Sequence, residues 1–127
     1  MGVSTSYPTN WKDFEAYARN QLARTWNVDL APRRVLVGGS VSWKFDLVSQ
    51  NLRVVGDAKW LKNIRVPAAK WQGIAEYIWL LQKVDADRVF LVFGQDVEVP
   101  ERYLSRVRPI TAPVEFYYLG PSGLRVL

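Results

Sequence analysis

The sequence predicts a single α/β domain in which a mixed central β-sheet is flanked by helices. The hydrophobic period changes repeatedly between helical spacing and strand alternation, in the order α-β-β-β-α-β-α-β. The chain has 127 residues, 49% of them hydrophobic, without a repeat, low-complexity tract or linker-like stretch. This is the size of one domain. We expect it to cover residues 1–127, with a core at about 11–93 and a C-terminal helix and strand at about 100–119.

Each predicted element has its own signal. A first helix at 11–26 follows Pro8, with Thr9 or Asn10 as N-cap. Its predicted apolar face consists of Trp11, Phe14, Ala18, Leu22 and Thr25. A second helix begins at Pro67, which suits a first helical turn, and runs to about residue 84; a third covers 100–108. The predicted strands are 35–37, 41–48, 52–60, 88–93 and 114–119, with turns at 38–39 and 50–51 and loose ends at 1–10 and 120–123.

The composition excludes several kinds of chemistry. There is no cysteine, which excludes disulfides, thiolate metal sites and a cysteine nucleophile. There is no histidine either, which excludes serine–histidine hydrolysis, histidine-ligated zinc and imidazole proton transfer. Any reaction must therefore use carboxylates, lysines, hydroxyl groups or a bound metal ion.

The charge balance favours an anionic partner. Seventeen Lys and Arg residues stand against twelve Asp and Glu, a net charge of +5, which favours an anionic partner, most often nucleic acid. No stretch approaches the ~18 apolar residues of a membrane span, and residues 1–10 are polar, unlike a signal peptide. We therefore expect no membrane partner and a cytoplasmic location, which the absence of cysteine also fits.

The most informative stretch is residues 42–62, which reads as a strand hairpin. Alternate residues of a strand share a face. On the second strand, Asp57 and Lys59 are therefore expected to face away from the small residues Gly56 and Ala58. Small residues on one face suggest that a helix packs closely there, and hence that this strand is central in the sheet.

The preceding strand divides in the same way. Its predicted apolar face consists of Val41, Trp43, Phe45 and Leu47. Asp46 then lies on the opposite face. Because the hairpin places the two strands side by side, we expect Asp46, Asp57 and Lys59 to meet on one concave polar face.

Two carboxylates and a lysine form a recognisable chemical unit. Aspartate oxygens are ligands suited to Mg²⁺, and such an ion activates water and neutralises charge on a phosphodiester. The lysine, ~7 Å along the strand from Asp57, is placed to orient that water or stabilise the transition state. The carbonyl of Ala58, between them, is a further candidate metal ligand.

At these residues the sequence resembles the PD-(D/E)XK nuclease superfamily, the restriction-endonuclease-like fold. Asp46 matches the acid of the first strand and Asp57-Ala58-Lys59 the (D/E)-X-K of the next. The similarity in element order, α-β-β-β-α-β, covers roughly residues 11–93. It implies a Mg²⁺-dependent enzyme, with Mn²⁺ as a substitute, that hydrolyses phosphodiester bonds of nucleic acid, DNA favoured, for example in repair or restriction.

Three further positions bear on the resemblance. Several members carry a glutamate on the first helix that completes the metal site, which would match Glu15; the alternative is a rim residue paired with Arg19. Phe45 stands where the family name has proline. A subset of the family has a glutamine and a tyrosine four residues apart on the second helix, and Gln72 matches the glutamine. Tyr77 follows Gln72 by five residues and is therefore not assigned to the signature.

Basic residues around the motif suggest phosphate contacts. The candidate nucleic-acid-binding residues are Lys62, Arg65, Lys70, Gln72, Arg33 and Arg34. The alternative for each is an ordinary solvated surface residue. Trp60 and Trp71 are candidates for stacking on bases, although aromatics in such apolar patterns usually belong to the core.

The second helix is apolar nearly all round, which suggests a homodimer. Its apolar residues are Trp71, Ile74, Tyr77, Ile78, Trp79, Leu80 and Leu81. Monomers rarely leave large apolar patches exposed, so a two-fold interface would cover them, unless the C-terminal helix and strand do so within the chain. The small size also favours recognition of DNA shape, junctions or ends, or a partner protein that supplies specificity.

Three other interpretations of the motif remain open. In the first, Asp57 and Lys59 form a salt bridge on a solvent-facing strand, which contributes little to stability. In the second, the same fold binds nucleic acid or scaffolds a complex without cleavage. In the third, the chain is an unrelated α/β adaptor, and the carboxylates of Asp46 and Asp57 would then lie far apart.

Overall fold

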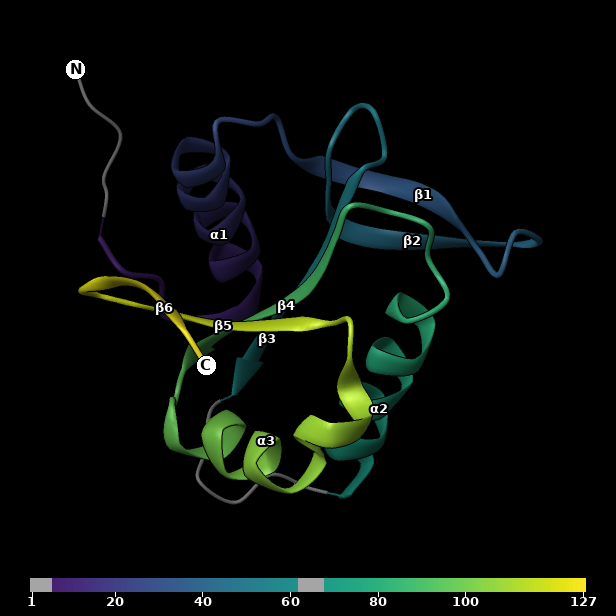
Figure 1. The fold of residues 1–127 in the computed structure, drawn as a ribbon. Coiled ribbons are helices and arrows are strands. Elements are labelled where there is room, and N and C mark those ends of the chain that lie inside the picture. Colours follow the sequence, from purple (N-terminus) through teal and green to yellow (C-terminus); the bar gives the residue numbers. More distant parts are fainter. Residues whose placement is uncertain (1–5, 62–67) are drawn as a thin grey trace.

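The computed structural model describes residues 6–61 and 68–127, and of residues 68–70 only the backbone. In these residues it contains a single α/β domain with three helices and a six-stranded mixed sheet (Figure 1). The elements are α1 (Trp11–Trp26), β1 (Ala31–Val37), β2 (Val41–Val48), β3 (Val54–Leu61), α2 (Ala68–Leu81), β4 (Arg88–Gln95), α3 (Glu98–Thr111), β5 (Glu115–Gly120) and β6 (Gly123–Val126).

The strands lie in the sheet in the order in which they occur in the chain. Antiparallel pairing joins β1 to β2, β2 to β3 and β5 to β6, whereas β3, β4 and β5 are parallel. The two parallel connections run through α2 and α3. Both of these helices cover one face of the sheet and α1 covers the other, so the domain has three layers (Figure 1).

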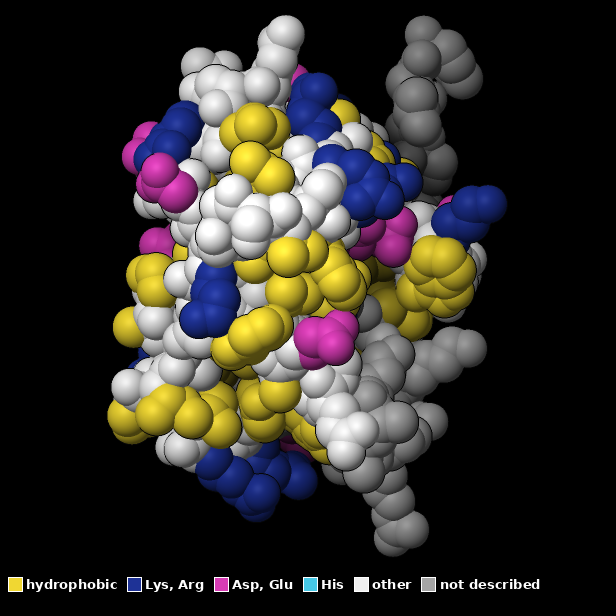
Figure 2. Space-filling model, turned by 90° about the vertical axis from the view of Figure 1, so that its right-hand side faces the viewer, with side chains coloured by type: hydrophobic (Ala, Val, Ile, Leu, Met, Phe, Trp, Pro, Cys, Tyr) yellow, Lys and Arg dark blue, Asp and Glu magenta, His cyan; other side chains and the backbone are white. Residues whose placement is uncertain are grey.

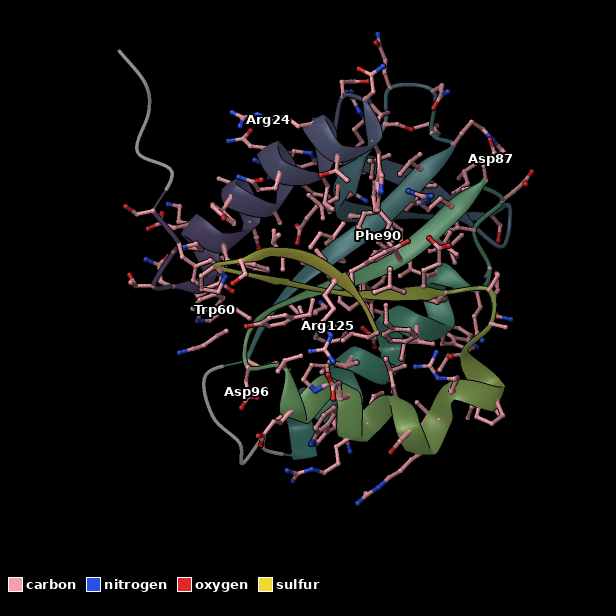
Figure 3. All side chains as sticks on the ribbon, turned by 60° about the vertical axis from the view of Figure 1, so that its left-hand side comes forward. Arg24, Trp60, Asp87, Phe90, Asp96 and Arg125 are labelled. Atoms are coloured by element: carbon pink, nitrogen blue, oxygen red, sulfur yellow. The ribbon has the colours of Figure 1, made fainter. Side chains whose placement is uncertain are left out.

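Each face of the sheet has its own hydrophobic core. On the α2 and α3 side, it includes Phe45, Val55, Ile74, Leu91, Phe93 and Leu104. On the α1 side, it includes Phe14, Leu22, Leu47, Trp60, Phe90 and Val92. The β3 residues divide between the two as the alternation predicts, because Val55 and Leu61 face α2 whereas Ala58 and Trp60 face α1. Figure 3 shows Trp60 near the start of α1.

Helix α1 has the predicted bounds and a defined cap at each end. The Asn10 side chain accepts a hydrogen bond from the backbone N–H of Asp13, and Asn27 ends the helix in the left-handed conformation. The apolar face is narrower than expected. Phe14, Ala18 and Leu22 are buried, but Trp11 is 59% exposed and Thr25 is exposed, so placing these two on the buried face was wrong.

Strand β2 contains a β-bulge that the alternation argument missed. Ala31 of β1 pairs with Val48 of β2, and Arg33 pairs with Phe45. Between these two pairs β1 advances by two residues and β2 by three, so β2 contains one extra residue. The extra residue falls at Asp46–Leu47 and reverses the facing of the strand there. Phe45 consequently lies in the α2-side core and Leu47 in the α1-side core. The prediction that both share one face was wrong.

The boundaries of β1, α3 and the C-terminal segment differ from those predicted. Strand β1 begins at Ala31, four residues earlier than predicted, and includes Pro32, which is tolerated because β1 is an edge strand. Helix α3 extends from Glu98 to Thr111, beyond the predicted range at both ends. The segment after β5 forms a hairpin with β6, with Gly123 at φ 120° in its turn. The expectation of a loose end there was wrong.

Two contacts fix the start of α1 against the sheet. The Phe14 ring packs over Gly94 of β4 so closely that a Cβ atom at Gly94 would lie 2.5 Å from it. The Tyr7 hydroxyl donates a hydrogen bond to the carbonyl of Leu119 (2.7 Å) and accepts one from the backbone N–H of Gln95 (2.9 Å). Glu15, which follows Phe14, is thereby held beside the ends of the parallel strands.

Candidate active site

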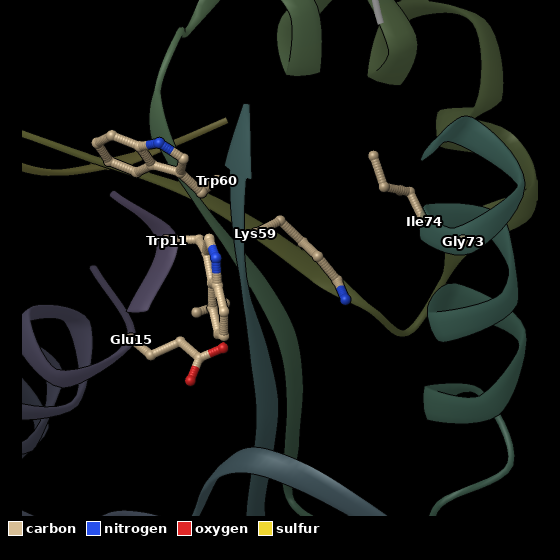
Figure 4. A pocket seen from close by; sticks show the side chains of 7 residues that line it. Trp11, Glu15, Lys59, Trp60, Gly73 and Ile74 are labelled. Atoms are coloured by element: carbon tan, nitrogen blue, oxygen red, sulfur yellow. The ribbon is translucent and has the colours of Figure 1, made fainter. Parts of the chain in front are cut away.

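A cavity of about 490 Å³ lies between α1, α2 and the carboxyl end of β3 (Figure 4). The described residues that line it are Trp11, Glu15, Ala58, Lys59, Trp60, Gly73 and Ile74. In open α/β sheets, ligands bind outside the carboxyl ends of the parallel strands. The cavity has this position, and a volume typical of ligand sites.

Asp57 lies beside the cavity, at the point where β2 and β3 separate. The two strands pair only at Leu47 with Gly56 and Val48 with Val55. One residue further on, the Oδ1 atom of Asp57 accepts a hydrogen bond from the backbone N–H of Asp46 at 2.9 Å. The carboxylate therefore supplies the acceptor for this N–H and joins the bulge of β2 to β3.

Lys59 forms an ion pair with the other oxygen of the same carboxylate. Its Nζ atom lies 2.8 Å from Oδ2 of Asp57, and both side chains are largely shielded from solvent, 16% and 4% exposed. The structure thus brings Asp46, Asp57 and Lys59 together, as expected from the spacing. It does not place Asp57 on a solvent-facing strand, because the residue is 3% exposed.

Tyr77 of α2 is the residue that the sequence argument missed. The Lys59 Nζ atom lies over its ring, 3.4 Å from the centroid, which is a cation–π contact. Burial, and then the negative charge of Asp57, raise the pKa of Tyr77. In the sequence, Tyr77 stands between Ile74 and Ile78, which are both buried, and this position could have indicated that its ring faces the sheet. Its spacing of five residues from Gln72 instead argued against a role in the site.

Glu15 faces the cluster from α1 across the cavity (Figure 4). Burial, and then the negative charge of Asp46, raise the pKa of Glu15, and a hydrogen bond with the Asp46 side chain acts in the same direction. The charges of Arg19 and Lys59 act against this rise. The charges of both Asp46 and Arg19 thus act on Glu15, and its role as a contributor to a metal site stays a prediction.

The electrostatics of Asp57 reflect the same crowding of carboxylates. Burial raises the pKa of Asp57 to about 7, the charge of Asp46 adds to the rise, and the Lys59 ammonium and the Asp46 N–H oppose it. A bound cation would offset both the burial and the like-charge repulsion. In kind, these oxygen donors fit Mg²⁺.

The carboxylates do not form a finished metal centre. Across residues 6–61 and 68–127, no group of three or more acidic side chains is placed to hold a metal ion as it stands. A physical reason is visible at Asp57, where one oxygen already accepts the Asp46 N–H and the other pairs with Lys59. A carboxylate has about four acceptor positions, so each oxygen keeps room for a further partner. Ala58, whose carbonyl was a candidate ligand, lines the same cavity.

The candidate phosphate-binding residues are less closely gathered. Arg33 pairs with Asp29 at 2.8 Å, and Arg34 donates to the carbonyl of Ser42 at 3.3 Å. Neither arginine, nor the exposed Gln72, is among the described residues that line the cavity. Lys62 and Arg65, and the side chain of Lys70, lie outside the described residues.

The apolar surface of α2 is largely covered within the chain. Ile74, Ile78, Leu80 and Leu81 are buried, and Trp71 stacks on Tyr103 of α3 with 4.6 Å between ring centroids. Trp79 remains 56% exposed. Figure 2 shows hydrophobic side chains on this side of the molecule, interrupted by single charged ones. No helix of the described part is long and apolar enough to cross a membrane. The homodimer remains a prediction.

Comparisons of the chain with protein-family models, curated proteins and solved structures find no match.

Proposed function

We propose that this protein is a Mg²⁺-dependent nuclease that hydrolyses phosphodiester bonds of nucleic acid, with DNA as the favoured substrate. The observation that carries the proposal is the connection of Asp46, Asp57 and Lys59 between the bulge of β2 and the middle of β3, beside a cavity that Lys59 and Glu15 line. A merely structural ion pair would not need a second and a third carboxyl group beside it, because their repulsion is unfavourable.

Asp46 and Asp57 would hold the metal ion, with Glu15 and the Ala58 carbonyl as further donors. When bound, the ion supplies water activation and neutralisation of phosphate charge. Asp57 also fixes the position of Lys59, since the 2.8 Å ion pair and the ring of Tyr77 confine the ammonium group from two sides. Lys59 is thus placed to donate hydrogen bonds to a phosphate oxygen on which charge develops.

The acid–base part of the reaction falls to the groups with a raised pKa. Water attacks phosphorus, the bond from phosphorus to the leaving oxygen breaks, and the attacking water loses a proton. Glu15 lines the cavity and its pKa is raised, so it is better suited to take up this proton than an ordinary exposed carboxylate. The leaving oxygen is protonated from solvent.

A non-catalytic nucleic-acid-binding module is the second candidate. The observation in its favour is that both oxygens of Asp57 already have partners in the protein, the Asp46 N–H and Lys59. On this alternative, the carboxylate serves to hold β2 against β3, and a basic surface alone binds the polyanion.

The two candidates are separated by a cleavage panel with the full chain. End-labelled branched, duplex and single-stranded DNA, together with matched RNA, are incubated with Mg²⁺, Mn²⁺ or EDTA. The nuclease proposal expects cleavage of at least one substrate with Mg²⁺ and with Mn²⁺, and none with EDTA. Binding of the same substrates without any cleavage would favour the second candidate.

A further inference from the structure

Trp11, the first residue of α1, is an exposed aromatic side chain at the mouth of the candidate active site. Its side chain lines the 490 Å³ cavity together with Glu15 and Lys59, yet 59% of the residue is exposed. Trp11 and Glu15 are four residues apart and so share one face of α1. Figure 4 shows the indole close to the Glu15 carboxyl group, on the α1 side of the cavity.

Three other tryptophans, Trp60, Trp71 and Trp79, are occupied by contacts within the chain or lie elsewhere. Trp60 is 5% exposed and packs against Phe14 at 5.2 Å between ring centroids, and Trp71 stacks on Tyr103. Both were candidates for base stacking, but Trp60 is buried, and Trp71 is not among the described residues that line the active-site cavity. Trp79 is exposed as well, but it borders the groove between α2 and α3 instead of the active-site cavity. Trp11 alone among these four combines exposure with a place beside Lys59 and Glu15.

From this geometry we infer that Trp11 is a stacking platform for an unpaired base of the substrate strand, next to the phosphodiester bond that is cut. The inference rests on the proposed function, and it names the substrate class. A phosphate at Lys59 brings the adjacent nucleotide to the cavity mouth, where the indole is the large apolar surface available to it. Stacking on an aromatic side chain suits any base, because every base has a π-face.

The base must be unpaired or terminal for a physical reason. Inside a duplex, both faces of a base are covered by its neighbours in the stack, so an indole reaches a base face only where that stack is interrupted. Single strands, flaps, branch points and frayed ends provide such a face, whereas the interior of a blunt duplex does not. Trp11 therefore selects a strand with an open base over continuous duplex.

The test measures binding separately from cleavage. Fluorescence anisotropy of the full-length protein is recorded in Ca²⁺ with three labelled probes, an oligothymidylate, the same length of abasic sugar-phosphate chain, and a blunt duplex; an oligouridylate distinguishes RNA from DNA. The variants are Trp11→Ala, Trp11→Phe and, as matched control, Trp79→Ala. Trp11 is exposed, and alanine is the better helix former, so the fold is expected to persist, as thermal melting would verify.

We expect Trp11→Ala to weaken oligothymidylate binding about 5- to 150-fold, which corresponds to the ~1–3 kcal/mol of one stacked base at 1.36 kcal/mol per tenfold. Abasic-chain binding should not change, Trp11→Phe should keep most of the affinity, and Trp79→Ala should bind like the wild type. The inference is overturned by unchanged oligothymidylate binding in Trp11→Ala, by an equal loss on the abasic chain, or by wild-type preference for the blunt duplex.

The result is separable from the fate of the proposed function. Trp11-dependent base binding without Mg²⁺-dependent cleavage would remove the nuclease proposal and leave a base-stacking site. Cleavage that does not depend on Trp11 would retain the nuclease and remove the inference.

Discussion

The Asp57 carboxylate accepts a hydrogen bond from the backbone N–H of Asp46, 11 residues earlier in the chain, at 2.9 Å. This contact lies where β2 leaves β3, one residue beyond their last paired positions. It connects the two carboxylates of the candidate metal site through the backbone of one of them. The position of the Asp46 side chain is consequently tied to the orientation of Asp57, and through Asp57 to Lys59.

The stability of the protein should fall as pH rises from about 4 to 7. The pKa of Asp57 is raised to about 7 in the folded protein, against about 3.9 in an unfolded chain. Between these two pKa values the folded state binds the proton more tightly than the unfolded state. Raising the pH through this range therefore lowers the free energy of unfolding by a few kcal/mol, on the order of the pKa difference. In urea unfolding, Asp57→Asn should flatten this fall relative to the wild type.

Asp87→Asn is the matched control for that experiment. Asp87 is paired with Arg53 at 2.8 Å, and this partner lowers the pKa of Asp87, the opposite direction to the shift of Asp57. Its replacement should leave the fall between pH 4 and 7 in place. A wild-type slope retained in Asp57→Asn would show that Asp57 does not carry the raised pKa.

Metal binding should compete with protons at the same carboxylates. At pH 8, Mg²⁺ should raise the melting temperature of the wild type, with a stabilisation of about 2.7 kcal/mol at one hundred times the dissociation constant. At pH 5.5 the shift should shrink, because Asp57 is protonated and metal ligands must lose their protons. Asp46→Asn should abolish the shift at pH 8. An equal shift in Asp46→Asn would place the metal elsewhere.

Tyr77 should act on turnover through Lys59. In Tyr77→Leu the ring under the ammonium is lost, and a cation–π contact of ~0.5–2 kcal/mol corresponds to a roughly 2- to 30-fold lower kcat, with little change in KM. Tyr77→Phe keeps the ring and should keep most of the activity. Steady-state kinetics of both variants provide the measurement. Equal losses in the two variants would mean that the hydroxyl group matters, not the ring.

Lys59 itself should affect the reaction more than binding. Lys59→Met removes the ammonium group but keeps most of the apolar stem. Loss of one charge-stabilising donor typically lowers kcat about 10²–10³-fold, whereas DNA binding in Ca²⁺ should change far less. Single-turnover cleavage beside anisotropy makes the comparison. A loss of binding as large as the loss of turnover would assign Lys59 to substrate affinity instead.

The meeting of Asp46, Asp57 and Lys59 was predictable because a hairpin fixes which residues are neighbours. The alternation of β3 alone, with Gly56 and Ala58 on one side, already placed Asp57 and Lys59 on the other. Close packing accounts for the small residues, since a Cβ atom at Gly56 would lie 2.4 Å from the ring of Phe90. Element order and most boundaries followed equally from local hydrophobic periods.

The features that escaped prediction depend on contacts distant in sequence. No glycine or proline marks the bulge at Asp46–Leu47, which arises from pairing with β1. The cation–π contact of Tyr77 required the exact placement of α2 over β3. A helical period cannot tell that Trp11 borders a cavity instead of the core, which leaves its side chain exposed. The hairpin of β5 and β6 was hidden by glycines that read as a loose end.

The central claim is that the cluster around Asp57 hydrolyses nucleic acid, and its most direct test compares wild type with Asp57→Asn in one assay. A DNA junction with single-stranded arms is incubated with each protein at pH 8 in Mg²⁺, and the products are resolved by length. We predict cleavage by the wild type and none by Asp57→Asn, which should still fold and still bind the junction. Cleavage by Asp57→Asn at the wild-type rate would contradict it, as would a wild-type protein that binds the junction and never cuts it.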